Sequence, residues 1–347
     1  MRKLVTIRKI DEIRPIEGAD AIEVAILGGW QVVIKKGSSN VGDLVAYAEI
    51  DSWIPTELAP FLSKGKEPRE FEGVKGERLR TVKMRGALSQ GLLIDLFTVA
   101  EYCKGVVNSK GIEVANRIYS LGDDLSDVLG VKKWEATIPA QLAGQVKGNF
   151  PALIPKTDQE RVQNLSTELD KARSNGVAFT VEEKLEGSSM TCYLIDGVFG
   201  VCSRNLDLKR DEANSFWKVA IEQNIEQRMR DAGRENFAIQ GELIGPGIQK
   251  NIYKLNKIDF YVFDVYDIKT GKYLTPPDRR HLVDVLGLKN VPVLETGVSL
   301  GAMQEIIDGA DGESALFKTL REGVVYKAND GSMTFKSISN EYLSKEK

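Results

Sequence analysis

The stretch "VEEKLEGSSM" (residues 181–190) places one lysine among three carboxylates, directly before a glycine and two serines. Alternate residues of a β-strand face the same side, so Lys184 should share a face with Glu182 and Glu186, and the apolar residues between them should point inward. The nearby carboxylates would raise the pKa of the lysine, and a protonated lysine is a poor nucleophile. The charge pattern alone therefore favours a salt-bridged strand. A bound divalent metal with a polyphosphate would instead favour a reactive amine.

The composition indicates a globular protein of two domains. The chain has 347 residues, of which 42% are hydrophobic and 28% charged. No run of about 18 apolar residues predicts a membrane span, and the start, "MRKLVTIRKI", lacks the apolar core of a secretory signal. The net charge of −3 means that any nucleic-acid site must be a local basic patch.

Cysteine and histidine usage excludes several kinds of catalytic site. Cys103, Cys192 and Cys202 form no CxxC pair, which argues against a zinc ribbon and for a reducing, cytoplasmic location. The single histidine, His281, is expected to be an exposed helix residue. Histidine-based triads and zinc hydrolases are therefore poor candidates.

The first half of the chain is predicted to be a small β-barrel. Its β-rich runs are residues 21–27, 30–36, 43–50, 79–85 and 91–96. About five strands within roughly 100 residues is the strand count of an OB-fold. We therefore expect an OB-like nucleic-acid-binding module over residues 1–130, followed by a connector over residues 131–150 that contains proline and glycine.

The second half, residues 151–347, alternates strands with helices and is predicted to be α+β, with antiparallel sheets flanked by helices. Asp196-Gly197 marks the turn of a hairpin, which would bring Arg204 opposite Ser189 and close to the lysine strand. The helical spacing of apolar residues predicts a helix over residues 211–233.

Lys184-Leu-Glu-Gly resembles motif I (KxDG or KxEG) of the covalent nucleotidyltransferases, which include DNA ligases, RNA ligases and mRNA capping enzymes. KxxG alone is a weak signal, but further elements resembling the motifs of that superfamily follow in the same order. They are "SRN" (203–205), "IQGELIG" (239–245), "FYVFDVYD" (260–267), "EGVVYK" (322–327) and "FKSIS" (335–339).

The resemblance narrows to one clade of ATP-dependent RNA ligases, which carry an OB-like module ahead of the transferase domain and seal 3′-OH RNA nicks. This narrower resemblance rests on three features: the segment "IPKTDQERVQNL" (154–165), the segment "FKSISNEYL" (335–343) and the N-terminal barrel. Only eleven residues follow Lys336, which leaves no room for the C-terminal OB domain usual in DNA ligases and capping enzymes.

The resemblance also implies roles for individual residues. Lys184 would attack the α-phosphorus of ATP and become lysyl-AMP, and Glu186 and Glu322 would hold Mg²⁺ or Mn²⁺ or its water. The other nucleotide contacts would be Glu183 at the adenine edge, Arg204 at ribose or the acceptor phosphate, Glu242 at a ribose hydroxyl, Phe263 stacked on adenine with Phe260 as the second choice, and Lys336 at the α-phosphate.

Structural alternatives stay open for several of these residues. Glu183 could form a plain salt bridge, Arg204 an ion pair with Glu182, and Phe263 part of the core. The segment "FKSIS" (335–339) resembles motif V, in which many relatives have a second lysine, but Ile338 stands at that position in this chain. Lys327 is considered as its replacement.

The barrel combines basic and aromatic side chains as single-strand binders do. The predicted nucleic-acid contacts are Trp30, Lys35, Lys36, Arg78, Arg80, Lys83 and Arg85. A solvated basic rim is the alternative interpretation of any one of them.

The predicted function is therefore an ATP-dependent RNA ligase that joins 3′-OH and 5′-phosphate ends, acting as a monomer on a nicked RNA or RNA-containing duplex. Its cofactors would be ATP and Mg²⁺ or Mn²⁺. One alternative is a GTP-dependent capping-type guanylyltransferase. The other is a non-catalytic RNA-binding protein with an OB domain.

Overall fold

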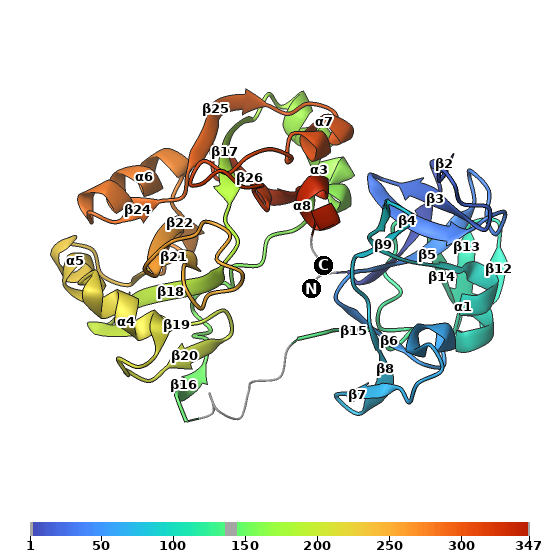
Figure 1. Cartoon of the computed structure of the whole chain (residues 1–347), viewed down its shortest axis with the longest axis horizontal. Helices are drawn as coiled ribbons and strands as arrows, with labels where there is room; N and C mark the ends of the chain where they lie inside the picture. Colours follow the sequence, from blue (N-terminus) through green and yellow to red (C-terminus); the bar gives the residue numbers. More distant parts are fainter. Residues whose placement is uncertain (1–2, 136–143, 346–347) are drawn as a thin grey trace. The chain divides into compact units, whose positions relative to one another are not determined.

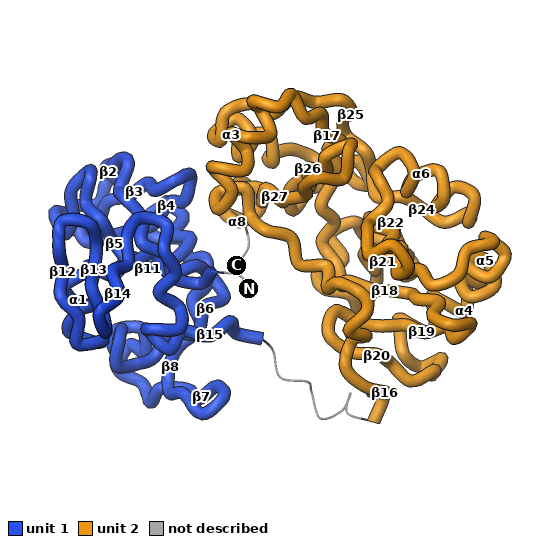
Figure 2. The backbone as a smooth tube through the Cα atoms, turned by 180° about the vertical axis from the view of Figure 1, so that it is seen from behind, with its two compact units in different colours: residues 1–137 blue, residues 138–347 orange. Residues whose placement is uncertain are grey.

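The computed structural model describes residues 3–135 and 144–345. The chain forms two compact units, residues 1–137 and residues 138–347, which Figure 2 shows in different colours. No helix among the described residues is long and apolar enough to cross a membrane.

The first unit consists mainly of short antiparallel strands. They are β1 (Val5–Lys9), β2 (Glu12–Pro15), β3 (Ile22–Leu27), β4 (Trp30–Lys35), β5 (Leu44–Glu49), β6 (Ser52–Pro55), β7 (Arg69–Phe71), β8 (Val74–Arg78), β9 (Val82–Met84), β10 (Ala87–Ser89), β11 (Gly91–Asp95), β12 (Val106–Asn108), β13 (Gly111–Val114), β14 (Arg117–Ser120) and β15 (Lys132–Lys133). Helix α1 (Leu96–Cys103) and a 3₁₀ turn, η1 (Pro60–Ser63), complete the unit's described elements. The sheets have the orders β1-β5-β11, β2-β3-β4, β15-β6-β8-β7, β12-β13-β14 and β9-β10.

The predicted count of about five strands in the first 100 or so residues is too low, because eleven strands, β1 to β11, lie in the described part of that stretch. Four of the five predicted runs do form strands, namely β3, β4, β5 and β11. The run 79–85 does not form one strand. It leaves the ladder after Leu79, whose N–H donates to Ser52, and a new strand, β9, begins at Val82.

The second unit begins with β16 (Val146–Asn149) and continues through α3 (Ser166–Ser174) into two sheets that are antiparallel except for a short parallel pairing of Tyr261–Val262 with Lys289–Asn290. The larger sheet has the order β16-β20-β19-β18-β21-β22-β23, with β24 pairing with β22. Its strands are β18 (Ser188–Ile195), β19 (Val198–Cys202), β20 (Leu206–Leu208), β21 (Phe237–Ile244), β22 (Asp259–Asp267), β23 (Lys272–Tyr273) and β24 (Lys289–Asn290). The smaller sheet has the order β25-β17-β26-β27, and its strands are β17 (Ala178–Lys184), β25 (Val293–Ser299), β26 (Gly323–Ala328) and β27 (Thr334–Ile338).

Helices cover each sheet of the second unit, and Figure 1 shows them flanking the strands. The larger sheet shares a core with α4 (Ser215–Glu222), α5 (Ile225–Asp231) and α6 (Pro276–Val285). The smaller sheet packs against α3 and α7 (Met303–Asp308). The last helix, α8, spans Asn340–Lys345, and a 3₁₀ turn, η2, spans Val162–Asn164. The α+β class and the antiparallel sheets agree with the sequence prediction.

Two local predictions have different outcomes. The hairpin turn at Asp196-Gly197 is present, because Ile195 pairs with Val198 and both turn residues have positive φ (48° and 77°), as a two-residue type I′ turn requires. The helix predicted over residues 211–233 is instead two helices, α4 and α5. Asn224 adopts φ 51°, a left-handed conformation that no α-helix can contain.

A β-bulge interrupts the pairing of β21 with β22. Gln240 pairs with Asp264 and Gly241 pairs with Val262, so Phe263 has no partner in the ladder. Bulges of this kind bend a strand and redirect a side chain. Gly241 is required beside the bulge, because a Cβ there would overlap the carbonyl oxygen of Tyr261 and lie 2.6 Å from the Phe260 ring.

We therefore expect Gly241→Ala to destabilise the second unit by about 2 kcal/mol or more, since backbone atoms would have to move. Gly148→Ala is the matched control, because a Cβ at this strand position meets no atom within 4 Å. Thermal unfolding of both variants checks the prediction. Equal melting temperatures for the two would show that the strands around Gly241 can adjust.

Candidate active site

Lys184 is the last residue of β17, which is an inner strand of the smaller sheet. Its antiparallel partner is Gly323, the first residue of β26. This register places Glu322, just before β26, beside the lysine, and the two side chains form an ion pair at 2.7 Å. Both remain partly exposed, with 24% and 20% of their side chains accessible, so a ligand can still reach the amine.

Glu182 does not lie on an exposed face, as the strand pattern had suggested. It is only 1% exposed, because the larger sheet and α6 cover this side of β17. Its carboxylate pairs with the buried Arg279 of α6 and lies 3.8 Å from the ammonium of Lys327 on β26. The ion pair considered between Glu182 and Arg204 is therefore wrong.

Lys327 is also taken into this buried network. Its ammonium donates to the carbonyl oxygen of Phe263, at 2.6 Å, and pairs with Asp264. The carbonyl that the bulge removes from the ladder thus gains a charged donor. Because Lys327 is 5% exposed and held by β22, it does not replace the second lysine of motif V. Ile338, at that position, is itself buried.

The two aromatic residues proposed to stack on adenine have different environments. Phe260 is fully buried in the core of the larger sheet, so the second choice is excluded. Phe263 is only partly buried and packs against a small cluster that includes Tyr253 and Leu185, next to the lysine. Phe263 therefore remains the candidate for the nucleobase.

Glu183 and Glu186 lie on either side of the lysine. The Glu183 carboxylate accepts a hydrogen bond from the backbone N–H of Ala315, at 2.8 Å, and burial raises its pKa. The backbone N–H of Glu186 donates to the hydroxyl of Tyr253, at 2.7 Å. The backbone N–H of Lys250 approaches the Glu186 carboxylate at 3.4 Å.

Glu242 lies on β21, opposite Ser189 of β18. Burial raises its pKa to about 8, with Glu322 and Glu186 adding to the increase and Lys184 and Arg204 opposing it. Charges from both sheets therefore act on the same small region. The site is a lysine surrounded by acidic side chains from β17, β21 and the start of β26.

The acidic residues fit a metal that keeps most of its own water. Among the described residues, no group of three or more His, Cys, Asp or Glu side chains is arranged to hold an ion. Glu186 and Glu322 nevertheless offer the hard oxygen ligands that Mg²⁺ prefers, and Mg²⁺ is commonly bound by one or two carboxylates together with substrate phosphates. This donor set suits a magnesium or manganese ion that arrives with a nucleotide.

The segment of residues 154–165 lies against the site. The sequence pattern indicated no role for any of its side chains. Asp158 pairs with Arg204, which follows β19, and Arg161 forms a parallel bridge with Lys336 of β27. Thr157 hydrogen-bonds Ser189 at 2.8 Å. These contacts join irregular backbone to strands far away in the chain, which periodicity cannot reveal.

One barrel residue is contradicted by the structure. Trp30 is fully buried against Tyr47, with ring centroids 5.4 Å apart, so it belongs to the core, and the prediction that it contacts nucleic acid is wrong. Arg78 pairs with Asp51 and lies over the ring of Trp134, 3.8 Å from its centre. The other predicted contacts, Lys35, Lys36, Arg80, Lys83 and Arg85, are exposed.

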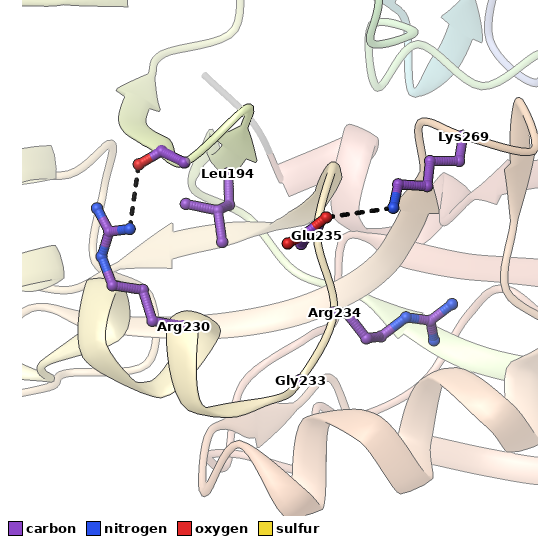
Figure 3. Close-up of a pocket in the computed structure, with 7 residues that line it drawn as sticks. Leu194, Arg230, Gly233, Arg234, Glu235 and Lys269 are labelled. Carbon is purple, nitrogen blue, oxygen red and sulfur yellow. Dashed lines mark hydrogen bonds and ion pairs between the residues drawn. The ribbon is translucent and has the colours of Figure 1, made fainter.

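A surface cavity elsewhere in the second unit has about 440 Å³ of space, and Figure 3 shows the residues that line it. Its three basic side chains already have acidic partners: Arg230 pairs with Glu226, Arg234 with Asp267 and Lys269 with Glu235. The cavity contains none of the motif residues, so we do not assign it to nucleotide binding.

Comparisons with known proteins agree with the fold and the motifs. An RNA ligase family model matches residues 177–340, and an OB-fold domain model matches residues 4–96. The structure is similar to that of a lysine-to-alanine variant of the RNA ligase from Naegleria gruberi, with ATP and manganese. The TM-score is 0.85 at 42% sequence identity, and the match covers 99% of each chain.

A glutamate-to-alanine variant of the same ligase, with AMP and manganese, gives the same TM-score, identity and coverage of both chains. The ligase with pyrophosphate gives a TM-score of 0.84 at 42% identity, over 100% of this chain and 99% of the other. No match is found among curated protein sequences. The chain therefore belongs to the RNA ligase family, with an OB-fold module ahead of the ligase domain, which confirms the predicted class of enzyme.

The raised pKa of Glu242 should make the stability of the folded protein depend on pH. Between the ordinary carboxyl pKa of 4.5 and about 8, the folded protein keeps a proton that the unfolded chain has lost. This contribution to stability is complete below pH 4.5 and declines as the pH rises to 8. Glu242→Gln stays neutral and lacks the decline, so its melting temperature minus that of the wild type should increase from pH 5 to pH 8.

Thermal unfolding of Glu242→Gln and wild type across this range measures the difference. Glu235→Gln, at a carboxylate whose side chain is 79% exposed, is the control and should show no such trend. A difference for Glu242→Gln that does not change with pH would contradict the raised pKa.

Proposed function

We propose that this RNA ligase seals nicks in RNA or RNA-containing duplexes through a covalent AMP adduct on Lys184. The observation that carries the proposal is the ion pair of Lys184 with Glu322, at a place where the charges of Lys184, Glu322 and Glu186 all act on Glu242. ATP and a divalent metal are the predicted cofactors, and the similar Naegleria ligase was solved with ATP and manganese. A monomer in the cytoplasm is part of the proposal, and three free thiols are consistent with that location.

In the first step the Lys184 nitrogen attacks the α-phosphorus of ATP. A nitrogen–phosphorus bond forms as the bond to pyrophosphate breaks. The lysine attacks as the neutral amine, and its nitrogen lies 2.7 Å from the Glu322 carboxylate. A metal held through Glu186 and Glu322 would neutralise phosphate charge. Lys336, two strands away on β27, would contact the α-phosphate as charge builds there.

The later steps reuse the same site. The 5′-phosphate of the broken strand attacks lysyl-AMP, which frees the lysine and leaves AMP on that end. The neighbouring 3′-hydroxyl then attacks the activated phosphorus and releases AMP. Arg204 is exposed and suits the incoming phosphate, since a guanidinium can bind phosphate in a bidentate manner. Phe263 would hold the adenine, and Glu242 a ribose hydroxyl, throughout these steps.

The first test is the gain of one AMP by the intact protein. Wild type incubated with ATP and magnesium should increase in mass by one adenylyl group, whereas Lys184→Ala should not, because it lacks the proposed nucleophile. Lys147→Ala is the matched control, since it removes an ion-paired lysine of the same unit, 3.0 Å from Asp207. Labelling of Lys184→Ala to the wild-type level would refute the assigned nucleophile. Transfer from GTP instead of ATP would favour a capping-type enzyme.

The barrel is proposed to hold the duplex. The hairpin β9-β10 carries Lys83 and Arg85 on exposed positions, and Arg80 precedes it. Val82 and Met84 of β9 are also exposed, at 44% and 38%, so the hairpin presents basic and apolar groups together. Such a surface suits a polyanion with apolar sugar and base surfaces. Lys35 and Lys36, at the end of β4, add further exposed positive charge.

We predict that Arg80→Ala with Arg85→Ala lowers nick sealing about tenfold or more at moderate salt, and self-adenylylation by less than twofold. Phosphate contacts release counterions, so sealing by the wild type should also fall steeply as salt rises. The control is Lys104→Ala with Lys110→Ala, which removes the same charge from exposed positions near α1. If both double variants seal nicks equally well, the hairpin is not the duplex contact.

A further inference from the structure

Tyr253 lies in the loop of residues 245–258, between β21 and β22, and none of the nucleotidyltransferase motifs includes it. Its side chain is almost completely buried, at 1% exposed, and packs with Leu185 and Ile244. The hydroxyl accepts the backbone N–H of Glu186 at 2.7 Å. A loop between two strands of the larger sheet thus bonds the acidic residue that follows the nucleophilic lysine.

The loop is held in a specific conformation. Gln249, Asn251 and Lys254 all have positive φ, between 44° and 50°, which is uncommon for residues other than glycine and costs free energy. The side chain of Asn251 closes the turn, because it bonds both the N–H and the carbonyl oxygen of Leu255 at 3.1 Å. A loop with this many constraints presents Tyr253 in one orientation.

The same loop approaches the Glu186 carboxylate as well as its backbone. The N–H of Lys250, three residues before the tyrosine, lies 3.4 Å from Oε1. The loop therefore contacts Glu186 at two points, the backbone N–H through Tyr253 and the carboxylate through Lys250.

We propose that Tyr253 is a positioning residue for Glu186 that sets the orientation of this carboxylate toward the divalent metal. The proposal rests on the function assigned above. Carboxylates bind metals well when their own partners fix them, and loss of such a partner typically weakens metal affinity about 10- to 100-fold. Without the hydroxyl, the buried N–H of Glu186 loses its acceptor, and the turn after β17 gains freedom.

The test uses the full chain with Tyr253→Phe, which removes only the hydroxyl. We expect the magnesium concentration for half-maximal adenylylation to rise about tenfold or more. The rate at saturating magnesium should stay within about threefold of wild type, because Tyr253 contacts neither ATP nor Lys184 in this account. Binding of Mn²⁺ in the presence of α,β-methylene ATP, measured by electron paramagnetic resonance, should weaken by a similar factor without any turnover.

Three further variants separate positioning from stability. Tyr193→Phe removes another tyrosine hydroxyl in the same unit, one that bonds Asp207 and Lys147 away from the site, and should leave the metal requirement unchanged. Asn251→Ala opens the loop without touching the tyrosine and should shift the requirement in the same direction. It therefore tests the proposal even if Tyr253→Phe folds poorly. In a Glu186→Gln background, Tyr253→Phe should cause no further shift in manganese binding.

The outcomes distinguish this proposal from the proposed function. Absence of an AMP adduct on the wild type would refute the function, and the manganese measurement would still report on Tyr253. A wild type that is adenylylated normally, with metal titrations that coincide for wild type, Tyr253→Phe and Asn251→Ala, would overturn the positioning role. A shift of the same size in Tyr193→Phe would also overturn it, because the effect would then be one of general stability.

Discussion

A buried network of charged side chains joins the two sheets of the second unit, and the whole site depends on this network. Glu182 of β17 meets Arg279 of α6 and Lys327 of β26, and Lys327 in turn meets Asp264 and the carbonyl oxygen of Phe263 on β22. Desolvation of such groups is costly, and removal of one partner typically destabilises a protein by about 3–5 kcal/mol because a charge is left unpaired. Arg279 also donates to the carbonyl oxygen of Val262, so α6 is bonded to both sheets. This network fixes β17, which carries Lys184, relative to β22, which carries Phe263.

In the proposed mechanism the smaller sheet carries the three residues that act on the phosphates, and its register brings them close together. Lys184 ends β17, Glu322 precedes the neighbouring strand β26, and Lys336 lies on the next strand, β27. Residues far apart in sequence therefore meet at one end of three adjacent strands. The larger sheet adds Glu242 from β21 and Phe263 from the bulge in β22. The nucleotide would thus lie between groups from both sheets.

The sequence predicted the class of fold correctly, because strands have a short period that local pattern reveals. The motif spacing predicted a site around Lys184, and the structure brings Lys184 and Glu322 of that site together. It predicted wrongly where burial is decided by distant partners. Glu182 alternates with apolar residues as an exposed side chain would, yet Arg279, almost a hundred positions away, makes it a core residue. Trp30 resembled a base-stacking residue, but its strand turns it toward Tyr47. Local patterns indicate which residues share a face, and only the tertiary structure shows what covers that face.

The same limit applies to Lys327 and Tyr253. Nothing in "EGVVYK" shows that the last lysine points at a bulge carbonyl, because the bulge arises from the pairing of β21 with β22. Tyr253 stands in an irregular loop without any period, and its hydroxyl reaches a backbone N–H that precedes it by 67 residues. Both residues contact the backbone of other site residues, Lys327 at the carbonyl oxygen of Phe263 and Tyr253 at the N–H of Glu186. Sequence motifs reveal side chains that contact the substrate better than they reveal the residues that position those side chains.

The central claim is that the adduct on Lys184 is an intermediate and not a side product. The most direct measurement starts from the purified AMP–protein, freed of ATP, and adds a nicked RNA duplex with a 5′-phosphate and a 3′-hydroxyl. We predict that AMP leaves the protein, appears on the 5′ end, and is released as one phosphodiester bond forms for each adduct consumed. A protein that keeps its AMP in the presence of the nick, or that seals the nick only when free ATP is added, would contradict it.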